Sequence, residues 1–333
     1  MELKSSLLAD QVVLITGGTG SFGKQFVETV LREDTPRKLI IFSRDELKQS
    51  DMRQIFSEQK YPCMRYFIGD VRDKDRLYRA MDGVDVVIHA AALKQVPTAE
   101  YNPIEVIKTN VMGAANLIDA AIDRNVQQVI ALSTDKAANP INLYGATKLC
   151  SDKLFVAANG YSGHHGTRFS VVRYGNVMGS RGSVIPFFRR LGEAGQSLPI
   201  TDLRMSRFFI TLPQAVRFVL DSFEMMHGGE LYVPRIPSMK ITDLAQAVVP
   251  GAAMHESGLR PGEKLHEEMI SAEEGRRALR VGDRYVLQPD LAAWGYQAPL
   301  DGVPVAEGFH YTSDTNDQWF TAAEITKILE TDA

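Results

Sequence analysis

The sequence predicts a doubly wound α/β fold, in which helices cover both faces of a parallel β-sheet. Short, continuously apolar runs, such as residues 12–16, are typical of parallel strands that are buried on both faces. Amphipathic helical stretches separate these runs, and strands that alternate with helices form parallel sheets through right-handed crossovers. A glycine-rich turn follows the first run directly, at residues 17–23.

The alternation is regular over the first half of the chain. Expected strands are residues 12–16, 39–43, 64–68, 84–89, 128–133 and 169–174. Expected helices are residues 22–32, 47–56, 76–81, 105–124 and 144–158. After Gly175, glycine, proline and arginine become frequent and shorter pieces replace the alternation. We therefore expect a large domain over residues 1–175, which residues 211–225 could complete, and a smaller substrate-binding lobe with the C-terminal region over residues 176–333.

Composition argues against several classes of function. The chain has 333 residues and a formal net charge of -4, which does not favour nucleic acid or an anionic membrane as a partner. Its apolar runs are shorter than the roughly 18 residues that a membrane-spanning helix requires. Two cysteines, Cys63 and Cys150, are too few for a disulfide framework, and no H-E-x-x-H or paired-cysteine pattern predicts a metal site. We expect a cytoplasmic globular protein without a bound metal.

The turn after the first strand has the pattern of a dinucleotide-binding site. Its glycines fit G-x-x-G-x-x-G, with a predicted strand before them and a predicted helix after them. Glycine lets the backbone approach a pyrophosphate closely, and a helix N-terminus presents unpaired N–H groups and a partial positive charge. The expected cofactor contacts in this Rossmann-like turn are Gly17, Thr19, Gly20, Ser21, Phe22 and Gly23.

The residues after the second strand bear on the choice between NADP and NAD. Arg44 and Lys48 could clamp the 2′-phosphate of NADP, whereas Asp45 would favour the ribose diol of NAD if it pointed inward. The two cations favour NADP. Further cofactor contacts are expected where the second, third and fourth strands end, at Ser43, Asp70, Val71, Ala90, Ala91 and Ala92.

Tyr144 and Lys148 form a Y-x-x-x-K pattern in a predicted helix, where residues four apart share a face. The lysine ammonium would lower the pKa of the tyrosine, so that the phenol could accept a proton from a substrate hydroxyl during hydride transfer. The pattern lies shortly after a strand that ends at Ser133 and Thr134, and Thr134 could hydrogen-bond the same hydroxyl. Tyr144 and Lys148 are expected to contact the cofactor as well.

With the glycine turn and the Y-x-x-x-K pattern at this separation, the chain resembles the extended short-chain dehydrogenase/reductase family. Sugar-nucleotide 4,6-dehydratases of that family typically carry Thr-Asp-Glu where this chain has Thr134, Asp135 and Lys136. The segments that look like the inverting UDP-N-acetylglucosamine 4,6-dehydratases within the family are 43–48, 90–94, 133–148, 176–181 and 260–264.

This resemblance implies a reaction without net oxidation. Tyr144 takes the proton of the C4 hydroxyl while hydride leaves C4, and Lys136 removes the proton from C5. Asp135, with a raised pKa, protonates the departing C6 hydroxyl. Hydride returns to C6, and a proton returns to C5, from the opposite face if the configuration inverts. Lys136 can act as a base only if burial or nearby positive charge lowers its pKa. The implied product is a C5-inverted 6-deoxy-4-keto sugar nucleotide of the L-arabino series, the first intermediate of pseudaminic acid synthesis, and the tightly bound NADP is regenerated.

The resemblance also implies where UDP-N-acetylglucosamine binds. Asn176, Arg181 and Arg260 are implied as contacts of the diphosphate, because arginine suits phosphate oxygens. Glu263 could hold the uridine ribose, and Lys94 a phosphate or a sugar hydroxyl. Members of the family usually form dimers through the helices predicted at residues 105–124 and 144–158, so we expect a homo-oligomer.

Two other functions stay open on the sequence alone. A sugar-nucleotide 4-epimerase of the same family also uses Thr, Tyr and Lys, but it needs no acid/base pair at C5 and C6, so Asp135 and Lys136 favour a dehydratase. A non-catalytic NADP-binding regulatory protein is the second alternative. The intact Thr134, Tyr144 and Lys148 count against it.

Overall fold

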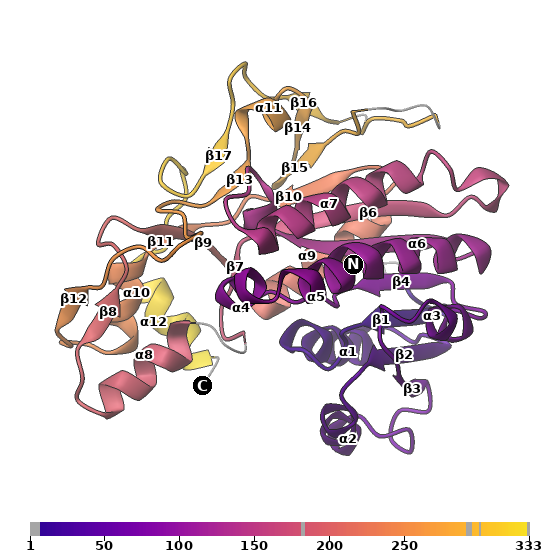
Figure 1. Cartoon of the computed structure of the whole chain (residues 1–333), viewed down its shortest axis with the longest axis horizontal. Coiled ribbons are helices and arrows are strands. Elements are labelled where there is room, and N and C mark those ends of the chain that lie inside the picture. Colours follow the sequence, from indigo (N-terminus) through magenta and orange to yellow (C-terminus); the bar gives the residue numbers. More distant parts are fainter. Residues whose placement is uncertain (1–6, 181–183, 291–294, 300, 332–333) are drawn as a thin grey trace, which may run out of the picture.

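The computed structural model describes residues 7–180, 184–290, 295–299 and 301–331. Within them, one large sheet is built from β1 (Val12–Thr16), β2 (Lys38–Ser43), β3 (Met64–Ile68), β4 (Val86–His89), β5 (Gln128–Thr134), β6 (Arg168–Tyr174), β10 (Leu231–Pro234), β14 (Ala278–Val281), β15 (Arg284–Leu287) and β16 (Val303–Pro304). The strand order is β16-β14-β15-β10-β6-β5-β4-β1-β2-β3 (Figure 1). From β3 to β10 neighbouring strands are parallel, and β15, β14 and β16 continue the sheet in antiparallel register.

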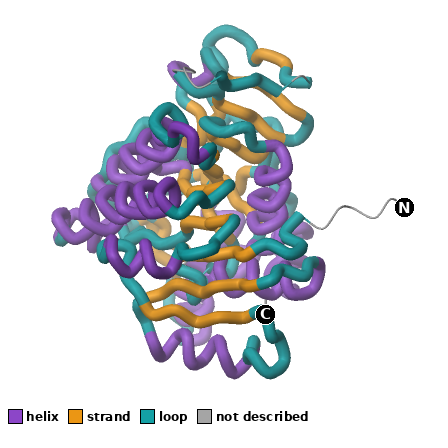
Figure 2. The backbone as a smooth tube through the Cα atoms, turned by 90° about the vertical axis from the view of Figure 1, so that its right-hand side faces the viewer, coloured by secondary structure: helices purple, strands orange, loops and turns teal. Residues whose placement is uncertain are grey.

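Helices lie on both faces of this sheet (Figure 2). They are α1 (Ser21–Glu33), α2 (Glu46–Ile55), α3 (Lys74–Ala80), α4 (Val96–Tyr101), α5 (Pro103–Ile107), α6 (Gly113–Asp123), α7 (Leu143–Ala158) and α9 (Leu212–Met225). Helix α1 packs beside α9, and α3, α6 and α7 pack side by side. The apolar strands are buried between these layers, so the predicted doubly wound α/β fold is confirmed.

A smaller lobe lies beside the large sheet and has its own apolar core (Figure 1). It contains β7 (Asn176–Val177), β8 (Leu198–Ile200), β9 (Ser206–Ile210), β11 (Ser238–Lys240), β12 (Met254–Glu256), α8 (Val184–Glu193), α10 (Ile241–Val248) and α12 (Ala322–Thr331). A third segment, with β13 (Glu268–Ile270), α11 (Ala272–Gly275) and β17 (Tyr311–Thr312), connects the lobe to the large sheet. The chain returns to the large sheet at α9, which packs beside α1, and again at β10 and β14–β16, which the sequence did not indicate.

The strand order reverses between β1 and β4, where the chain crosses from one half of the sheet to the other. In open α/β sheets, ligands bind outside the carboxyl ends of the strands at this reversal. The predicted glycine turn follows β1 and the alanine run 90–92 follows β4, so both lie at the reversal. The fold thereby places the predicted nucleotide-binding turn at the position where such sheets bind ligands.

The helix predicted over residues 105–124 is interrupted. Lys108–Met112 forms a π-helical turn, η1, between α5 and α6. The wider turn directs Asn110 inward, where its side-chain oxygen accepts from Leu93 N at 2.8 Å and its amide donates to Leu93 O at 2.9 Å and Thr147 Oγ1 at 3.1 Å. Apolar periodicity alone predicts a regular helix here. In the structure, Asn110 of the π-helical turn connects α7, through Thr147, to the loop that follows the alanine run, through Leu93.

We expect Gly23→Ala to destabilise the protein by about 1–3 kcal/mol, because a new methyl group must be forced into a filled contact. A Cβ at residue 23 would lie 2.2 Å from the carbonyl oxygen of Gly18, where α1 packs on the turn. Thermal and urea unfolding measure the effect. The control is Glu28→Ala on the exposed side of the same helix, which should change stability by less than about 0.5 kcal/mol. Equal stability of the two variants would contradict the prediction.

Candidate active site

One cavity of about 840 Å³ lies at the reversal of the strand order. Its walls include the glycine turn, the ends of β2, β4 and β5, the start of α7 and the loop 260–264 of the C-terminal half. All of the sequence-predicted site residues that the structure describes line this cavity except Asp135, and Arg181 lies outside the described residues. Segments that are far apart in the sequence therefore contribute to one site.

The glycine turn is closely packed against the backbone of the alanine run that follows β4. Gly17 has φ +67°, and a Cβ there would lie 2.9 Å from the backbone of Ala91. Gly20 is the N-cap of α1 and provides no side chain to occupy the first N–H groups of the helix. Exposed backbone donors at the start of a helix, with no side chain between them and a cavity, suit a pyrophosphate. The turn therefore fits the phosphate-binding role that the sequence predicts.

The far end of the cavity carries charged residues that already have partners. Arg44 lies 3.5 Å from Asp70, and Lys48 lies 2.7 Å from Asp45. Asp45 is also the N-cap of α2, since its side chain accepts a hydrogen bond from Lys48 N at 3.0 Å. Hydrogen bonds from Lys48 lower the pKa of Asp45. Asp45 is thus engaged by its own helix, and Arg44, whose side chain is half exposed, lines the cavity.

Helix α7 brings Tyr144 and Lys148 against the end of β5. The helix can approach so closely because residue 145 is glycine: a Cβ there would lie 2.1 Å from the carbonyl oxygen of Lys136. Burial raises the pKa of Tyr144 to about 12, opposed by the charge of Lys136 and a hydrogen bond with Thr134. Among the charged groups, Lys136 lowers the pKa of Tyr144 the most, rather than Lys148, which the sequence predicts for this role.

Lys148 is buried, and burial lowers its pKa while Asp152 opposes that shift. Asp152 accepts a hydrogen bond from Ser133 at 2.7 Å and lies 3.5 Å from the fully buried Arg173. Arg173 in turn binds Glu274 at 2.9 Å and the Met269 carbonyl at 2.9 Å. A chain of buried charges therefore connects Lys148 to the C-terminal segment around α11.

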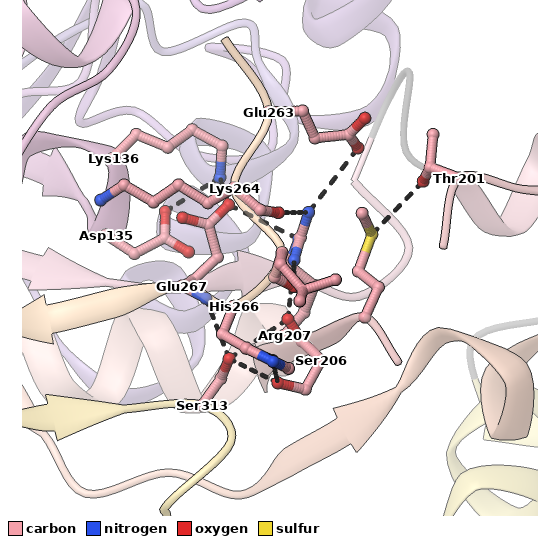
Figure 3. Close-up of polar contacts among 12 residues, drawn as sticks. Asp135, Lys136, Thr201, Ser206, Arg207, Glu263, Lys264, His266, Glu267 and Ser313 are labelled. Carbon is pink, nitrogen blue, oxygen red and sulfur yellow. Dashed lines mark hydrogen bonds and ion pairs between the residues drawn. The ribbon is translucent and has the colours of Figure 1, made fainter. Parts of the chain in front are cut away.

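Asp135 and Lys136 belong to a short 3-10 turn, η2 (Asp135–Ala137), directly after β5. The Lys136 ammonium lies 3.0 Å from Asp135 and 3.1 Å from Glu267, and Figure 3 shows the three side chains converging. Burial opposes the charged form, but the charges of Asp135 and Glu267 outweigh it and raise the pKa of Lys136. The lowered lysine pKa that a base would require is therefore not found in this structure, because the sequence did not reveal Glu267 as a second carboxylate partner of Lys136 beside Asp135.

Asp135 is fully buried and hydrogen-bonds the Thr134 hydroxyl at 2.8 Å. Burial and the nearby charge of Glu267 raise its pKa, in the direction that a general acid requires. Lys136 and Thr134, which both hydrogen-bond Asp135, lie on the cavity wall, whereas Asp135 itself does not line the cavity.

Loop 260–264 rests on the start of α7 and on the turn that follows β5. Asn142, the N-cap of α7, donates to the Gly262 carbonyl at 2.8 Å, and Lys264 donates to the Ala138 carbonyl at 2.7 Å. Glu263 lies 3.6 Å from Arg207, a residue of β9. The predicted substrate contacts that the structure brings together on the cavity wall are Lys94, Thr134, Asn176, Arg260 and Glu263.

Sequence reasoning missed three charged residues of this wall, namely Arg207, Lys264 and Glu267. Lys264 lies within a segment that carried the resemblance, but Arg207 and Glu267 have no local pattern of their own. Glu267 is 2% exposed, which is rare for a glutamate unless it is paired. Only the fold shows that it faces Lys136.

The match to known families covers most of this architecture. The model of the polysaccharide biosynthesis protein family matches residues 13–289. The chain belongs to this family. Of the residues that the structure describes, none form a cluster of metal-binding side chains, and no helix among them has the length and apolar character to cross a membrane.

Relatives of this family member resemble it over nearly its whole length. The chain is 54% identical over 325 residues, 95% of it and 96% of the relative, to the UDP-N-acetylglucosamine 4,6-dehydratase (inverting) of Campylobacter jejuni subsp. jejuni serotype O:23/36. It is 44% identical to the UDP-glucose 4-epimerase of Rickettsia massiliae over 85% of this chain and 84% of that one. The crystal structure of Pen from Bacillus thuringiensis superposes with a TM-score of 0.89 at 36% identity, covering 97% and 98% of the two chains. The resemblance inferred from the sequence is confirmed.

Glu274→Gln should lower the free energy of unfolding by about 3 kcal/mol at pH 7, because it removes a charge partner of a buried arginine. Glutamine keeps the capping box that Glu274 makes with Ser271. Burial opposes ionisation of Glu274, but Arg173 outweighs it and lowers the pKa below the ordinary 4.5. The charge therefore stabilises above that value, and its contribution is lost as the pH falls through the folded pKa.

Denaturant unfolding from pH 7 down to about pH 3 measures the stability difference between wild type and Glu274→Gln. This difference should become smaller at pH values below the ordinary pKa of glutamate. The matched control is Glu273→Gln, one residue earlier and 79% exposed. A difference that stayed constant across this pH range would contradict the assignment of the effect to the charge of Glu274.

Proposed function

We propose that this protein converts UDP-N-acetylglucosamine into water and the C5-inverted 6-deoxy-4-keto sugar nucleotide. The observation that carries the proposal is that Thr134, Tyr144 and Lys136 lie together on the wall of the cavity that the glycine turn also lines. The 54% identity with an inverting dehydratase supports the substrate and the stereochemistry. We further propose that the product enters pseudaminic acid synthesis.

The cavity suits a nicotinamide cofactor, and we propose NADP. The glycine turn and α1 would hold its pyrophosphate, and Arg44 and Lys48 would face a 2′-phosphate once they exchange their carboxylate partners for it. When bound, the cofactor supplies the acceptor and donor of hydride for C4 and C6. We assign residues 1–175 and α9 to cofactor binding, and the smaller lobe with loop 260–264 mainly to the sugar nucleotide.

The side chains of the wall account for the proton movements. Tyr144 accepts the proton of the C4 hydroxyl in its phenolate form, which the Lys136 charge and the hydrogen bond with Thr134 favour against burial. The carbonyl formed at C4 acidifies C5–H. A proton moves from the Lys136 ammonium to the Asp135 carboxylate, 3.0 Å away, which leaves a neutral amine and a neutral acid. The amine then takes the C5 proton and Asp135 supplies the proton for the departing C6 hydroxyl, through its hydrogen-bonded neighbours. As C6 receives the hydride, a proton returns to C5 from the opposite face, which gives the inverted product.

Location and assembly stay predictions. A homo-oligomer is supported by the exposed apolar side chains Tyr101, Ile104 and Met112 along α4, α5 and η1. A cytoplasmic location accords with the free thiols of Cys63 and Cys150.

Proton NMR of the purified protein with UDP-N-acetylglucosamine in deuterated water, without added cofactor, tests the reaction. We expect a new C6 methyl signal, deuterium at C5 and the couplings of an L-configured ring, because C5–H is lost to an exchangeable base. Mass spectrometry of the cofactor released on denaturation should identify NADP. A D-configured methyl sugar would contradict inversion, and no change even after adding NADP would contradict the proposed reaction.

A 4-epimerase is the second candidate, favoured by the 44% identity with an enzyme of that name. It would yield a C4 epimer and no methyl signal in the same spectra. The buried Asp135–Lys136 pair counts against it, because epimerisation at C4 requires no proton transfer at C5 or C6.

Lys136→Met should abolish water elimination, with a loss of about a hundredfold or more, because general acid–base catalysis contributes at least that much. Cofactor content should stay at the wild-type level, since the glycine turn is untouched. The control is Lys240→Met on an exposed strand end of the smaller lobe. Formation of the methyl sugar at the wild-type rate would show that Lys136 is not the base.

A further inference from the structure

Glu267 lies among the proton-transfer groups of the cavity although it comes from the C-terminal half of the chain. Its side chain is 2% exposed, and one carboxylate oxygen lies 3.1 Å from the Lys136 ammonium and 3.5 Å from Arg207 Nε. The other oxygen, Oε2, is buried without a hydrogen-bond partner within the described chain. Glu267 itself lines the cavity, and Figure 3 shows its carboxylate between Lys136 and Arg207.

The backbone around Glu267 is held from two sides. Its N–H donates to Ser313 Oγ at 2.9 Å, and its carbonyl accepts from Ser313 N at 2.8 Å. Arg207 donates to the carbonyls of Lys264 and Leu265 at 2.9 Å each, so the guanidinium fixes the loop and faces the carboxylate at once. A glutamate fixed in this way keeps its charge in one place relative to Lys136.

We propose that Glu267 is a positioning residue for the proposed dehydration, because its carboxylate fixes the Lys136 amino group at the cavity wall. Its negative charge also increases the affinity of the Asp135–Lys136 pair for the proton that the two residues share, and the positive charge of Arg207 opposes this effect. This inference rests on the proposed function in treating Lys136 as the group that exchanges a proton with C5.

The geometry gives Glu267 this role in both protonation states of Lys136. As an ammonium, Lys136 donates to Asp135 and Glu267 together. After one proton has moved to Asp135, the neutral amine still has two N–H groups and one lone pair. A hydrogen bond to the fixed Glu267 carboxylate then orients the amine and leaves the lone pair free to accept the C5 proton.

The charges around Lys136 predict the direction of the effect. The groups that face it are Asp135 and Thr134 at the end of β5, Tyr144 of α7, Lys94 after β4, Arg207 of β9, and Lys264 and Glu267 of the C-terminal half. With Asp135, Lys136, Arg207 and Glu267 all ionised, their formal charges sum to zero. Removing Glu267 leaves an excess of positive charge, so the pair releases its proton more easily, whereas removing Arg207 leaves an excess of negative charge and has the opposite effect.

The proton affinity of Lys136 is measurable without turnover, because only the neutral amine reacts with acetic anhydride. Purified protein is acetylated with a trace of reagent at about pH 9, where lysines are mostly protonated. Peptide mass spectrometry then gives the rate at Lys136 relative to the exposed Lys240. We expect Glu267→Gln to raise this relative rate about tenfold, which corresponds to a pKa lower by one unit, and Arg207→Gln to reduce it below the wild-type rate.

Matched variants separate charge from structure. Glu268→Gln makes the same chemical change one residue along and should leave the rate at Lys136 unchanged, and Glu267→Asp, which keeps the charge, should stay closer to wild type than Glu267→Gln. A role confined to holding the loop would lower the melting temperature and raise labelling of Lys94 as much as that of Lys136. Either that result or equal rates in Glu267→Gln and Glu268→Gln would overturn the proposal, and if Glu267→Gln does not fold, a rate in Arg207→Gln at or above wild type would do so.

Turnover gives a second readout that distinguishes this inference from the proposed function. In the dehydration assay, the alkaline limb of the pH–rate profile should move to lower pH by about one unit in Glu267→Gln. A wild-type protein that does not dehydrate UDP-N-acetylglucosamine would contradict the proposed function, while the acetylation rates would still decide the role of Glu267.

Discussion

The site depends on the close approach of α7 to the turn that follows β5. Residue 145 faces the Lys136 carbonyl oxygen so closely that only glycine fits, since a Cβ would lie 2.1 Å away. This contact brings Tyr144 beside Thr134 and Lys136, and Asn110 of the π turn fixes the same helix from its other side through Thr147. The geometry of the proposed proton-transfer groups is therefore set by backbone contacts between α7 and the turn after β5, and not by contacts among the side chains themselves.

The C-terminal half completes this wall by placing charges against it. Lys264 binds the Ala138 carbonyl, and Glu267 binds Lys136. Further from the cavity, Glu274 neutralises Arg173 behind Lys148. A charge buried without a partner costs several kcal/mol, so each of these contacts favours the docked arrangement of the two halves. Docking of the C-terminal half and the protonation of the site are thereby linked, because the segment around β13 and α11 supplies the carboxylates Glu267 and Glu274.

What the sequence predicted correctly was local. The glycine turn and the Y-x-x-x-K pattern each lie within one strand–turn–helix unit, so their spacing specifies their geometry. Glu267 could not be found in this way, because its partner Lys136 lies on another segment of the chain and its neighbour Arg207 on a third. The π-helical turn could not be predicted for a related reason. The apolar periodicity continues through residues 105–124, and only the tertiary contacts of Asn110 reveal the wider turn.

The error about Lys136 shows how protonation depends on such distant partners. From the sequence, Lys136 could act as a base only if burial or nearby positive charge lowered its pKa, because both disfavour the ammonium. In the structure, two buried carboxylates lie within 3.1 Å of it and reverse the sign. A base at C5 then requires transfer of one proton within the site, from Lys136 to Asp135, and not loss of a proton to water. Because that transfer leaves the total charge of the Asp135–Lys136 pair unchanged, it creates no uncompensated charge, and a lysine that is charged at rest is therefore compatible with the proposed role as a base.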